Sequence, residues 1–470
     1  MTDQSDSGGS GDRPNVILCM TDDQGWGDTG YNGHPQLETP HMDAMANEGV
    51  QFDRFYASSP VCSPTRGSCL TGRHPYRYGI TTANEGHMPD EEVTLAEALS
   101  DAGYRTGHFG KWHLGTLTTV VEESNRGGPR GAEHYAPPWE HGFDTCFSTE
   151  AKVPTWDPMI TPEISAIKGR VDESQVGNAY GSHYWTGSGE IATQNLDGDD
   201  SRVIMDRVVP FIRSAARQND PFLAVVWFHS PHAPDVAGPE YRERYAHRTE
   251  NEQHYYGTIS AIDDQIGRLR DELADLGVAD ETMLWFTSDN GPAAEGGGPG
   301  WHAGLRQQGK TGKLRGQKGT LYEGGVRVPG TLVWPDGIDE PRTVDVPCVT
   351  SDYYPTILDA VGVDVPDQPE PLDGVSLLPL LRGETDSRSA PIGFQASIHT
   401  ENGGDVAVID GDEKLIRPHA DAAFQLYDLA EDPYETEDLA REQPGRVDEL
   451  ETWLNDWQAS INDEERSTGA

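Results

Sequence analysis

The sequence predicts an α/β fold in which a central, mostly parallel sheet lies between helices, followed by a small antiparallel α+β unit. Three short, continuous apolar runs have the length and composition of buried strands, at residues 15–20, 222–228 and 282–287. Helical patterns lie between these runs, at residues 95–102, 201–217 and 251–276. Strands that alternate with helices favour a parallel sheet, because each parallel connection needs a crossover.

The chain divides into a large and a small domain. We expect residues 13–363 to form the large α/β domain, with a Gly-, Pro- and aromatic-rich excursion over the top of the sheet at residues 116–198. Residues 364–390 predict a linker, and residues 391–470 predict the small unit. Its expected elements are strands at 392–399, 405–410, 414–417 and 424–429 and a closing helix at 442–461. Residues 1–12 predict a short disordered lead rather than a secretory signal.

The charge balance excludes several classes of partner. The formal net charge is −44, from 79 acidic and 35 basic residues, so nucleic acid and anionic membranes would be repelled. Membrane insertion is not expected either, since no stretch approaches the ~18 apolar residues of a spanning helix. Lysine occurs only seven times. Abundant carboxylate with little lysine favours a halophilic host, because molar salt screens the self-repulsion; the alternative is an ordinary acidic mesophilic protein.

The cysteines indicate a reducing compartment. There are five of them, at positions 19, 62, 69, 146 and 348, and none forms a CxxC pair. An odd and sparse set predicts neither a disulfide framework nor a thiolate zinc site. We therefore expect a cytoplasmic protein.

Oxygen-bearing side chains follow two of the predicted strands. Asp22 and Asp23 come directly after the first strand, and Asp289 and Asn290 follow the strand at 282–287. Polar residues at the carboxyl ends of parallel strands are where open α/β sheets carry their sites. Adjacent carboxylates repel unless a cation gathers them, and hard oxygen ligands suit Ca²⁺ or Mg²⁺. Each pair alone is also common in solvated turns, but together they predict one metal site.

The most specific signal is the segment around Cys62. Its Cys62-x-Pro64-x-Arg66 motif, extended by Leu-Thr-Gly-Arg at 70–73, resembles the motif of the sulfatase family at which maturation enzymes oxidise cysteine to formylglycine (3-oxoalanine). The resemblance covers most of the chain. Further segments that resemble family signatures lie at residues 107–115, 231–234, 313–327, 372–381 and 426–437. The family implies an alkaline-phosphatase-like fold for the large domain.

The resemblance implies a sulfuric ester hydrolase with a covalent sulfo-enzyme intermediate. By this resemblance, Asp22, Asp23, Asp289, Asn290 and oxidised Cys62 bind Ca²⁺, with Mg²⁺ as the alternative. Sulfate oxygens shield sulfur with negative charge, so electrostatic stabilisation should be the largest catalytic term. The metal and three cations can supply it: Arg66, Lys111 and Lys318.

Proton transfers complete the expected mechanism. One hydroxyl of the hydrated aldehyde, activated by the metal, attacks sulfur. His232 or Lys318 then protonates the leaving alcohol, and His113 deprotonates the second hydroxyl, which expels sulfate. Lys111, His232 and Lys318 are also the expected substrate-binding residues. Lys111 and Lys318 both lie in segments that resemble family signatures, in a chain with only seven lysines, and a compact ammonium cannot be replaced by arginine, which favours function over surface charge for both.

The expected partners are a small-molecule or saccharide sulfate ester and a formylglycine-generating or other sulfatase-maturing enzyme. In the excursion, aromatic residues either stack on the substrate or pack the loops: Trp139, Trp156, Tyr184 and Trp185. Two alternative functions stay open. A phosphodiesterase or phosphonate monoester hydrolase could use the same nucleophile, and a metal-holding binding protein would result if Cys62 were never oxidised.

Overall fold

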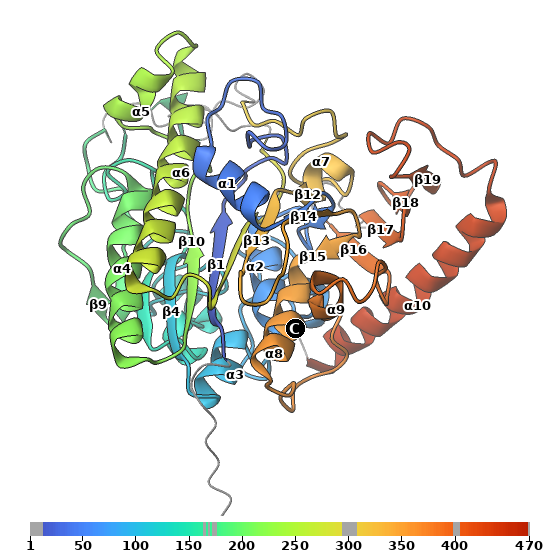
Figure 1. Cartoon of the computed structure of the whole chain (residues 1–470), viewed down its shortest axis with the longest axis horizontal. Coiled ribbons are helices and arrows are strands. Elements are labelled where there is room, and N and C mark those ends of the chain that lie inside the picture. Colours follow the sequence, from blue (N-terminus) through green and yellow to red (C-terminus); the bar gives the residue numbers. More distant parts are fainter. Residues whose placement is uncertain are drawn as a thin grey trace, which may run out of the picture.

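A computed structural model of the chain describes residues 13–162, 166–167, 170–171, 176–293, 308–397 and 405–468, without the side chains of 166–167, 170–171 and 462–468. Its core is a ten-stranded sheet in the order β14-β2-β13-β11-β1-β10-β4-β5-β8-β9 (Figure 1). The central parallel strands are β1 (Asn15–Thr21), β4 (Arg105–Lys111), β5 (Thr145–Thr149), β10 (Phe222–Trp227) and β11 (Thr282–Ser288). The flanking strands are β2 (Val50–Phe52), β8 (Trp185–Gly187), β9 (Glu190–Ile191), β13 (Gly330–Val333) and β14 (Arg342–Val344).

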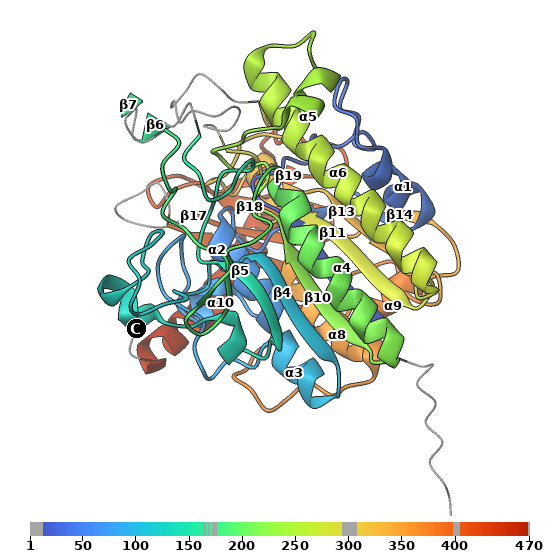
Figure 2. The same ribbon diagram turned by 90° about the vertical axis from the view of Figure 1, so that its left-hand side faces the viewer.

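Helices cover both faces of this sheet (Figure 2). One layer contains α1 (Pro40–Glu48), α4 (Asp200–Gln218) and α6 (Glu250–Leu276), and the other contains α2 (Cys62–Thr71), α3 (Leu95–Asp101) and α8 (Tyr353–Val361). Strand β1 is buried on both faces: Val16, Leu18 and Met20 pack toward α2, α3 and α8, whereas Ile17 and Cys19 pack toward the other layer. Alternate side chains of a strand point to opposite faces, which is why its sequence is a continuous apolar run.

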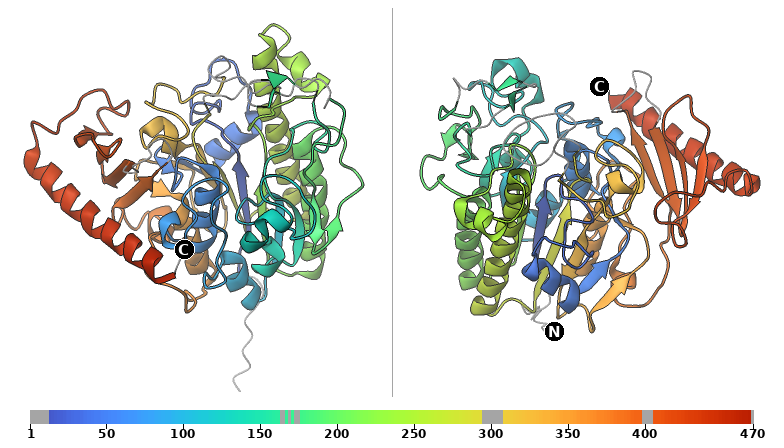
Figure 3. Two further views of the ribbon diagram at one scale, coloured as in Figure 1. Left: turned by 180° about the vertical axis from the view of Figure 1, so that it is seen from behind. Right: turned by 90° about the horizontal axis from the view of Figure 1, so that it is seen from above.

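The C-terminal residues form a separate antiparallel sheet with one long helix (Figure 3). Its strands are β16 (Ile392–Ala396), β17 (Asp405–Asp410), β18 (Glu413–Arg417) and β19 (Gln425–Asp428), and its helix is α10 (Pro444–Thr468). One face of this sheet shares an apolar cluster with the large domain, in which Tyr56, Leu321 and Val326 meet Phe394 and Ile416. The other face packs against α10 through Leu450 and Leu454. The small unit is therefore joined to the large one by a common core.

Short elements complete the chain. The remaining strands are β3 (Phe55–Tyr56), β6 (Ala166–Ile167), β7 (Arg170–Val171), β12 (Arg327–Val328) and β15 (Cys348–Val349). The remaining helices are α5 (Pro239–Arg244), α7 (Glu323–Val326), α9 (Leu378–Leu381) and the 3-10 turns η1 (Pro75–Arg77), η2 (Pro129–His134), η3 (Pro138–Glu140) and η5 (Thr350–Asp352). Strands β12, β3 and β15 form a small sheet between the two domains.

The predicted fold class is confirmed, and the details differ in two places. The segment 116–198 is not only an excursion, because it contributes β5, β8 and β9 to the main sheet. Strand β5 reads Thr-Cys-Phe-Ser-Thr and lacks the continuous apolar run that marks the other central strands. The expected first strand of the small unit ends at Ala396, and positions 398–399 and the lead 1–12 lie outside the described residues. Among the described helices, none is long and apolar enough to cross a membrane.

Candidate active site

The carboxyl ends of β1 and β11 bring the four predicted oxygen-bearing residues together. The two strands pair in parallel, with Thr21 opposite Ser288, so the residues that follow each strand lie side by side. The backbone N–H of Asp289 donates to the carbonyl of Thr21 at 3.1 Å, and the N–H of Asp23 donates to Asp289 Oδ1 at 3.1 Å. Asn290 Nδ2 donates to Asp23 Oδ1 at 2.7 Å. All four residues are buried.

Three cations surround these carboxylates. Lys111 Nζ, at the end of β4, lies 2.7 Å from Asp22 Oδ2, and Lys318 Nζ pairs with Asp23 Oδ1. Arg66 donates to Asp289 Oδ2 from Nε at 3.1 Å and from Nη2 at 2.6 Å. The predicted cations and carboxylates therefore converge on one buried centre.

Burial and charge act in opposite directions on the carboxyl groups. Burial alone would raise the pKa of Asp22, but the charges of Lys111 and Arg66 hold that pKa well below its usual value. Burial and the charge of Asp22 raise the pKa of Asp289 to about 7, against the opposing effect of Arg66. The carboxylates therefore repel one another even among three cations, which is an arrangement that a further cation would relieve.

The residues present fit a hard divalent metal. Potential ligand atoms of Asp22, Cys62 and Asp289 lie within 4.8 Å of one another, and so do those of Asp22, Asp23 and His232. Within the described part of the chain, Asp22 Oδ1 and Asn290 Oδ1 are buried oxygens without a hydrogen-bond partner. Buried acceptors are rarely left unsatisfied, so these two oxygens point to a ligand. An oxygen-rich set of this kind suits Ca²⁺ or Mg²⁺.

Cys62 is the first residue of α2, and its side chain is buried, with 2% exposure. The helix N-terminus directs backbone N–H groups and positive potential toward this position. Arg66 follows one turn later on the same helix, so that its guanidinium reaches Asp289 and also donates to the carbonyl of Lys111 at 3.1 Å. The spacing of the Cys-x-Pro-x-Arg motif thus places the cysteine and the arginine at the same carboxylates.

Two histidines line the same centre. His113 adopts a left-handed backbone with φ of 59°, as does Asp23 with φ of 67°, and few non-glycine residues adopt this region. His113 Nε2 lies 2.9 Å from Asn84 Oδ1, which also accepts from Asn125. This oxygen requires a proton on Nε2, so the buried Nδ1, for which the described residues offer no partner, carries the lone pair.

The second histidine, His232, follows β10. Its Nδ1 donates to the carbonyl of Ala233 at 2.7 Å, and its Nε2 lies 3.7 Å from Asp23 Oδ2. Burial lowers the pKa of His232 to about 3 and, with the charges of Lys111 and Arg66, holds the pKa of His113 well below its usual value. Both imidazoles are therefore neutral at pH 7.

One residue at the site was not singled out by the sequence analysis. Lys152 lies three residues after Thr149, which is the sheet partner of Lys111. Burial and the nearby charges of Lys111 and Lys318 together lower the pKa of Lys152 to about 8. The only sequence signal for it is the rarity of lysine, because no family motif covers it.

Two of the four aromatic residues singled out in the segment 116–198 contribute to packing. Tyr184 is fully buried, stacks on Phe147 at 4.0 Å and donates to Asp200 at 2.6 Å. Trp185 is buried and donates to Glu123 Oε1 at 2.6 Å. Trp139 and Trp156 are half-buried. Of the two explanations left open by the sequence, the structure favours loop packing for Tyr184 and Trp185.

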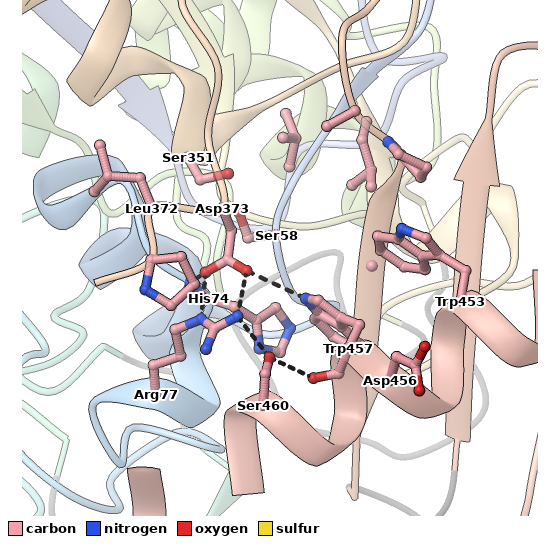
Figure 4. Close-up of a pocket in the computed structure, with 16 residues that line it drawn as sticks. Ser58, His74, Arg77, Ser351, Leu372, Asp373, Trp453, Asp456, Trp457 and Ser460 are labelled. Atoms are coloured by element: carbon pink, nitrogen blue, oxygen red, sulfur yellow. Dashed lines mark hydrogen bonds and ion pairs between the residues drawn. The ribbon is translucent and has the colours of Figure 1, made fainter. Parts of the chain in front are cut away.

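A cavity of about 310 Å³ lies elsewhere, between η1 and α10 (Figure 4). Arg77 pairs with Asp373 across it at 2.8 Å, and Trp457 contacts His74 edge to face. His74 follows the C-terminal end of α2, whereas Cys62 begins that helix. The cavity is therefore separate from the centre that Cys62 and the carboxylates form.

Comparisons with known proteins agree with this geometry. The family model "Sulfatase" matches residues 14–363, and the model "N-sulphoglucosamine sulphohydrolase, C-terminal" matches residues 316–459. Arylsulfatase A of Homo sapiens is 31% identical over 93% of this chain and 85% of its own length. Steryl-sulfatase of Mus musculus is 32% identical over 79% of this chain, and the match spans 65% of that relative. The solved structure of the PsFucS1 sulfatase from Pseudoalteromonas sp. has a TM-score of 0.75 at 23% identity and covers 97% of this chain and 92% of its own, which shows a shared fold.

Proposed function

The chain belongs to the sulfatase family, and we propose that it hydrolyses sulfate esters with a formylglycine made from Cys62. One observation carries the proposal: Cys62 begins α2 beside Asp22 and Asp289, in a centre that also holds Arg66 and Lys111. A sulfate ester keeps negative charge on its oxygens throughout the reaction. A buried set of cations stabilises that charge more strongly than water does.

We propose that a divalent metal, Ca²⁺ or alternatively Mg²⁺, is held by Asp22, Asp23, Asp289, Asn290 and oxidised Cys62. The metal would supply Lewis-acid stabilisation of the sulfate oxygens and lower the pKa of a bound hydroxyl. The hydrated aldehyde would supply the nucleophile and a second hydroxyl, which accounts for a covalent sulfo-enzyme intermediate that clears without attack by water. The proposal requires a formylglycine-generating or other sulfatase-maturing enzyme in the host.

The chain's own residues have distinct proposed roles. Lys111 and Lys318 bind sulfate oxygens, and Arg66 orients Asp289 while adding positive potential. His113 accepts a proton through Nδ1, since Asn84 engages its Nε2. The neutral state of this imidazole at pH 7 supports a role as general base.

The proton for the leaving alcohol comes from Lys318 or His232. Burial opposes the charge on Lys318, but the carboxylate of Asp23 outweighs it and raises the pKa of Lys318, so this ammonium carries a proton at pH 7. His232 donates its Nδ1 proton to a backbone carbonyl and presents a lone pair at Nε2. This favours Lys318 as the donor and His232 as a group that binds the substrate.

The test pairs the mass of the Cys62 peptide with specific activity, in preparations made with and without a maturation enzyme. Turnover of an aryl sulfate should rise in proportion to the fraction of Cys62 that is oxidised. Cys62→Ala should show no burst, and Cys62→Ser should release at most one equivalent of the alcohol and then stall, because a serine lacks the second hydroxyl. Sustained turnover by protein that carries only the free thiol would refute the proposed nucleophile.

The alternative functions have their own outcomes in this assay. A phosphodiesterase or phosphonate monoester hydrolase would turn over the phosphate diester or phosphonate ester of the same aryl alcohol faster than the sulfate. A metal-holding binding protein would bind metal and show no turnover when isolated from its own host, because Cys62 would remain a free thiol there.

A further inference from the structure

The loop that carries Lys318 runs between the two domains. It spans residues 315–323 and has no regular structure before α7 begins at Glu323. On the side of the large domain, the N–H of Lys318 donates to the carbonyl of Pro292 at 3.1 Å, and the N–H of Gly319 donates to that of Pro60 at 2.9 Å. These two bonds fix the middle of the loop but not its C-terminal end.

A buried ion cluster fixes that end. Glu323 and Lys414 are fully buried, and Glu435 is 1% exposed. Lys414 Nζ, from β18, lies 2.9 Å from Glu323 Oε1 and 2.9 Å from Glu435 Oε1. Glu435 Oε2 accepts from the N–H of Glu323 at 2.8 Å, and Tyr56 donates to Glu323 Oε2 at 2.9 Å. One ammonium of the small unit therefore joins the loop end, the turn that carries Glu435 and, through Glu323, the large domain.

Other contacts connect the same loop to the small unit. Arg315 donates to the hydroxyl of Tyr427 at 3.0 Å and to the carbonyl of Glu435 at 3.2 Å. Tyr322 donates to Gln425 Oε1 at 2.9 Å. Leu321 is buried in the apolar cluster that the two domains share. Both ends of the loop are thus attached to the C-terminal sheet, with Lys318 between them.

We propose that Lys414 is a positioning residue for Lys318, and that the C-terminal unit thereby forms part of the catalytic apparatus. This inference rests on the proposed role of Lys318. An ammonium on a flexible side chain acts in catalysis only if its backbone is held in place, and a misplacement of 1 Å can reduce a rate ~100-fold. Lysine is rare in this chain, and here it occupies a fully buried position where its compact ammonium reaches two carboxylates.

The test is a double-mutant cycle between Lys414→Met and Lys318→Ala, measured as kcat and KM on an aryl sulfate with matched oxidation of Cys62. Lys318→Ala alone should lower kcat about 100-fold or more. Lys414→Met alone should lower kcat about tenfold or more, whereas on the Lys318→Ala background it should add less than about twofold, because its effect passes through Lys318. If Lys414 acts independently of Lys318, Lys414→Met should lower kcat by the same factor in the wild type and in Lys318→Ala.

Arg446→Met is the matched control. Arg446 belongs to the same small unit and lies on α10, and its ion pairs in the described structure are with Asp410, Glu413 and Glu449, which are all outside the loop 315–323. This variant should leave kcat within about twofold, as expected for a partly exposed ion pair. Hydrogen exchange gives a readout that does not depend on activity: Lys414→Met should lower the protection of amides in residues 316–325, and Arg446→Met should not.

The outcomes separate the two proposals. Wild-type protein with oxidised Cys62 and no turnover refutes the sulfatase function, while the exchange experiment still tests the loop. The positioning role is wrong if Lys414→Met leaves both kcat and the hydrogen exchange of residues 316–325 unchanged. It is also wrong if Lys414→Met lowers kcat by the same factor in Lys318→Ala as in the wild type. If Lys414→Met fails to fold, Arg315→Met removes an exposed contact of the same loop, and it should lower kcat in the wild type but not in Lys318→Ala.

Discussion

Replacing Arg66 by methionine tests for a metal site at the carboxylates of Asp22 and Asp289 through thermal stability, without an activity assay. Arg66 is fully buried, with two hydrogen bonds to Asp289 and an ion pair to Asp22 at 3.8 Å. Removing one partner of a buried pair costs about 3–5 kcal/mol. With an unfolding entropy of ~2.1 cal/mol/K per residue, a chain of 470 residues should lose about 3–5 °C in Tm.

Excess Ca²⁺ should reduce the difference in Tm between the wild type and Arg66→Met. Without Arg66 the carboxylates of Asp22 and Asp289 attract a cation more strongly, so Ca²⁺ should bind the variant at least about tenfold more tightly. Each tenfold gain in affinity returns about 1.4 kcal/mol at saturating Ca²⁺. The difference in Tm between wild type and Arg66→Met should therefore be smaller by about 1–2 °C in excess Ca²⁺ than in chelator.

The matched control is Arg388→Met. Arg388 forms a buried, two-bond pair with Asp352, which lies in none of the potential metal clusters of the described residues. Arg388→Met should lower Tm about as much as Arg66→Met does in chelator, and this loss should be the same in Ca²⁺ and in chelator. Thermal melts of protein made without the maturation enzyme, so that Cys62 stays a thiol throughout, give both differences. If the difference in Tm between the wild type and Arg66→Met is the same or larger in Ca²⁺ than in chelator, there is no cation site at these carboxylates.

Three further predictions concern charge. The Tm should rise by several degrees between low and molar KCl, because salt screens the repulsion within a chain of net charge −44; melts that stay flat or fall would argue against a halophilic origin. Burial raises the pKa of Asp199 to about 7, so its folded-state pKa exceeds the unfolded value of ~3.9 and stability should fall as pH rises from about 4 to 7. Asp199→Asn keeps an N-cap acceptor for α4. It should reduce the loss of stability between pH 4 and 7 and should stabilise the protein above pH 7 by on the order of 1–3 kcal/mol, as measured by denaturant titration at several pH values. Lys111→Met should lower kcat/KM about 100-fold or more with little change in fold, as followed by steady-state kinetics and circular dichroism; an effect below tenfold would exclude it from the sulfate site.

Much of this centre could be predicted because its residues follow the clearest patterns in the chain. The apolar runs of β1 and β11 are continuous since both strands are buried on two faces, and their ends identify Asp22 and Asp289. The Cys62 motif needs only local spacing, because one helical turn places Arg66 beside the same carboxylates.

The remainder depends on tertiary contacts that leave no local pattern. Strand β5 carries Thr and Ser where a central strand is expected to be apolar, because its hydroxyls bond to neighbouring groups, such as Ser148 to His108 at 2.7 Å. Lys414 and Glu323 resemble surface charges in sequence, and only the packing of the small unit buries them. Their 91-residue separation explains why no motif could connect them.

The strand order also determines how this protein can be made. Strand β1 pairs with β10 and β11, which begin only at Phe222 and Thr282, so the ribosome must add most of the chain before the central strand gains its neighbours. At ~5–20 residues per second this takes on the order of tens of seconds. Until β10 is made, this apolar strand lacks both partners and stays exposed in the nascent chain. For the same period Cys62, whose side chain ends up 2% exposed, can be reached by an enzyme that the finished fold would exclude.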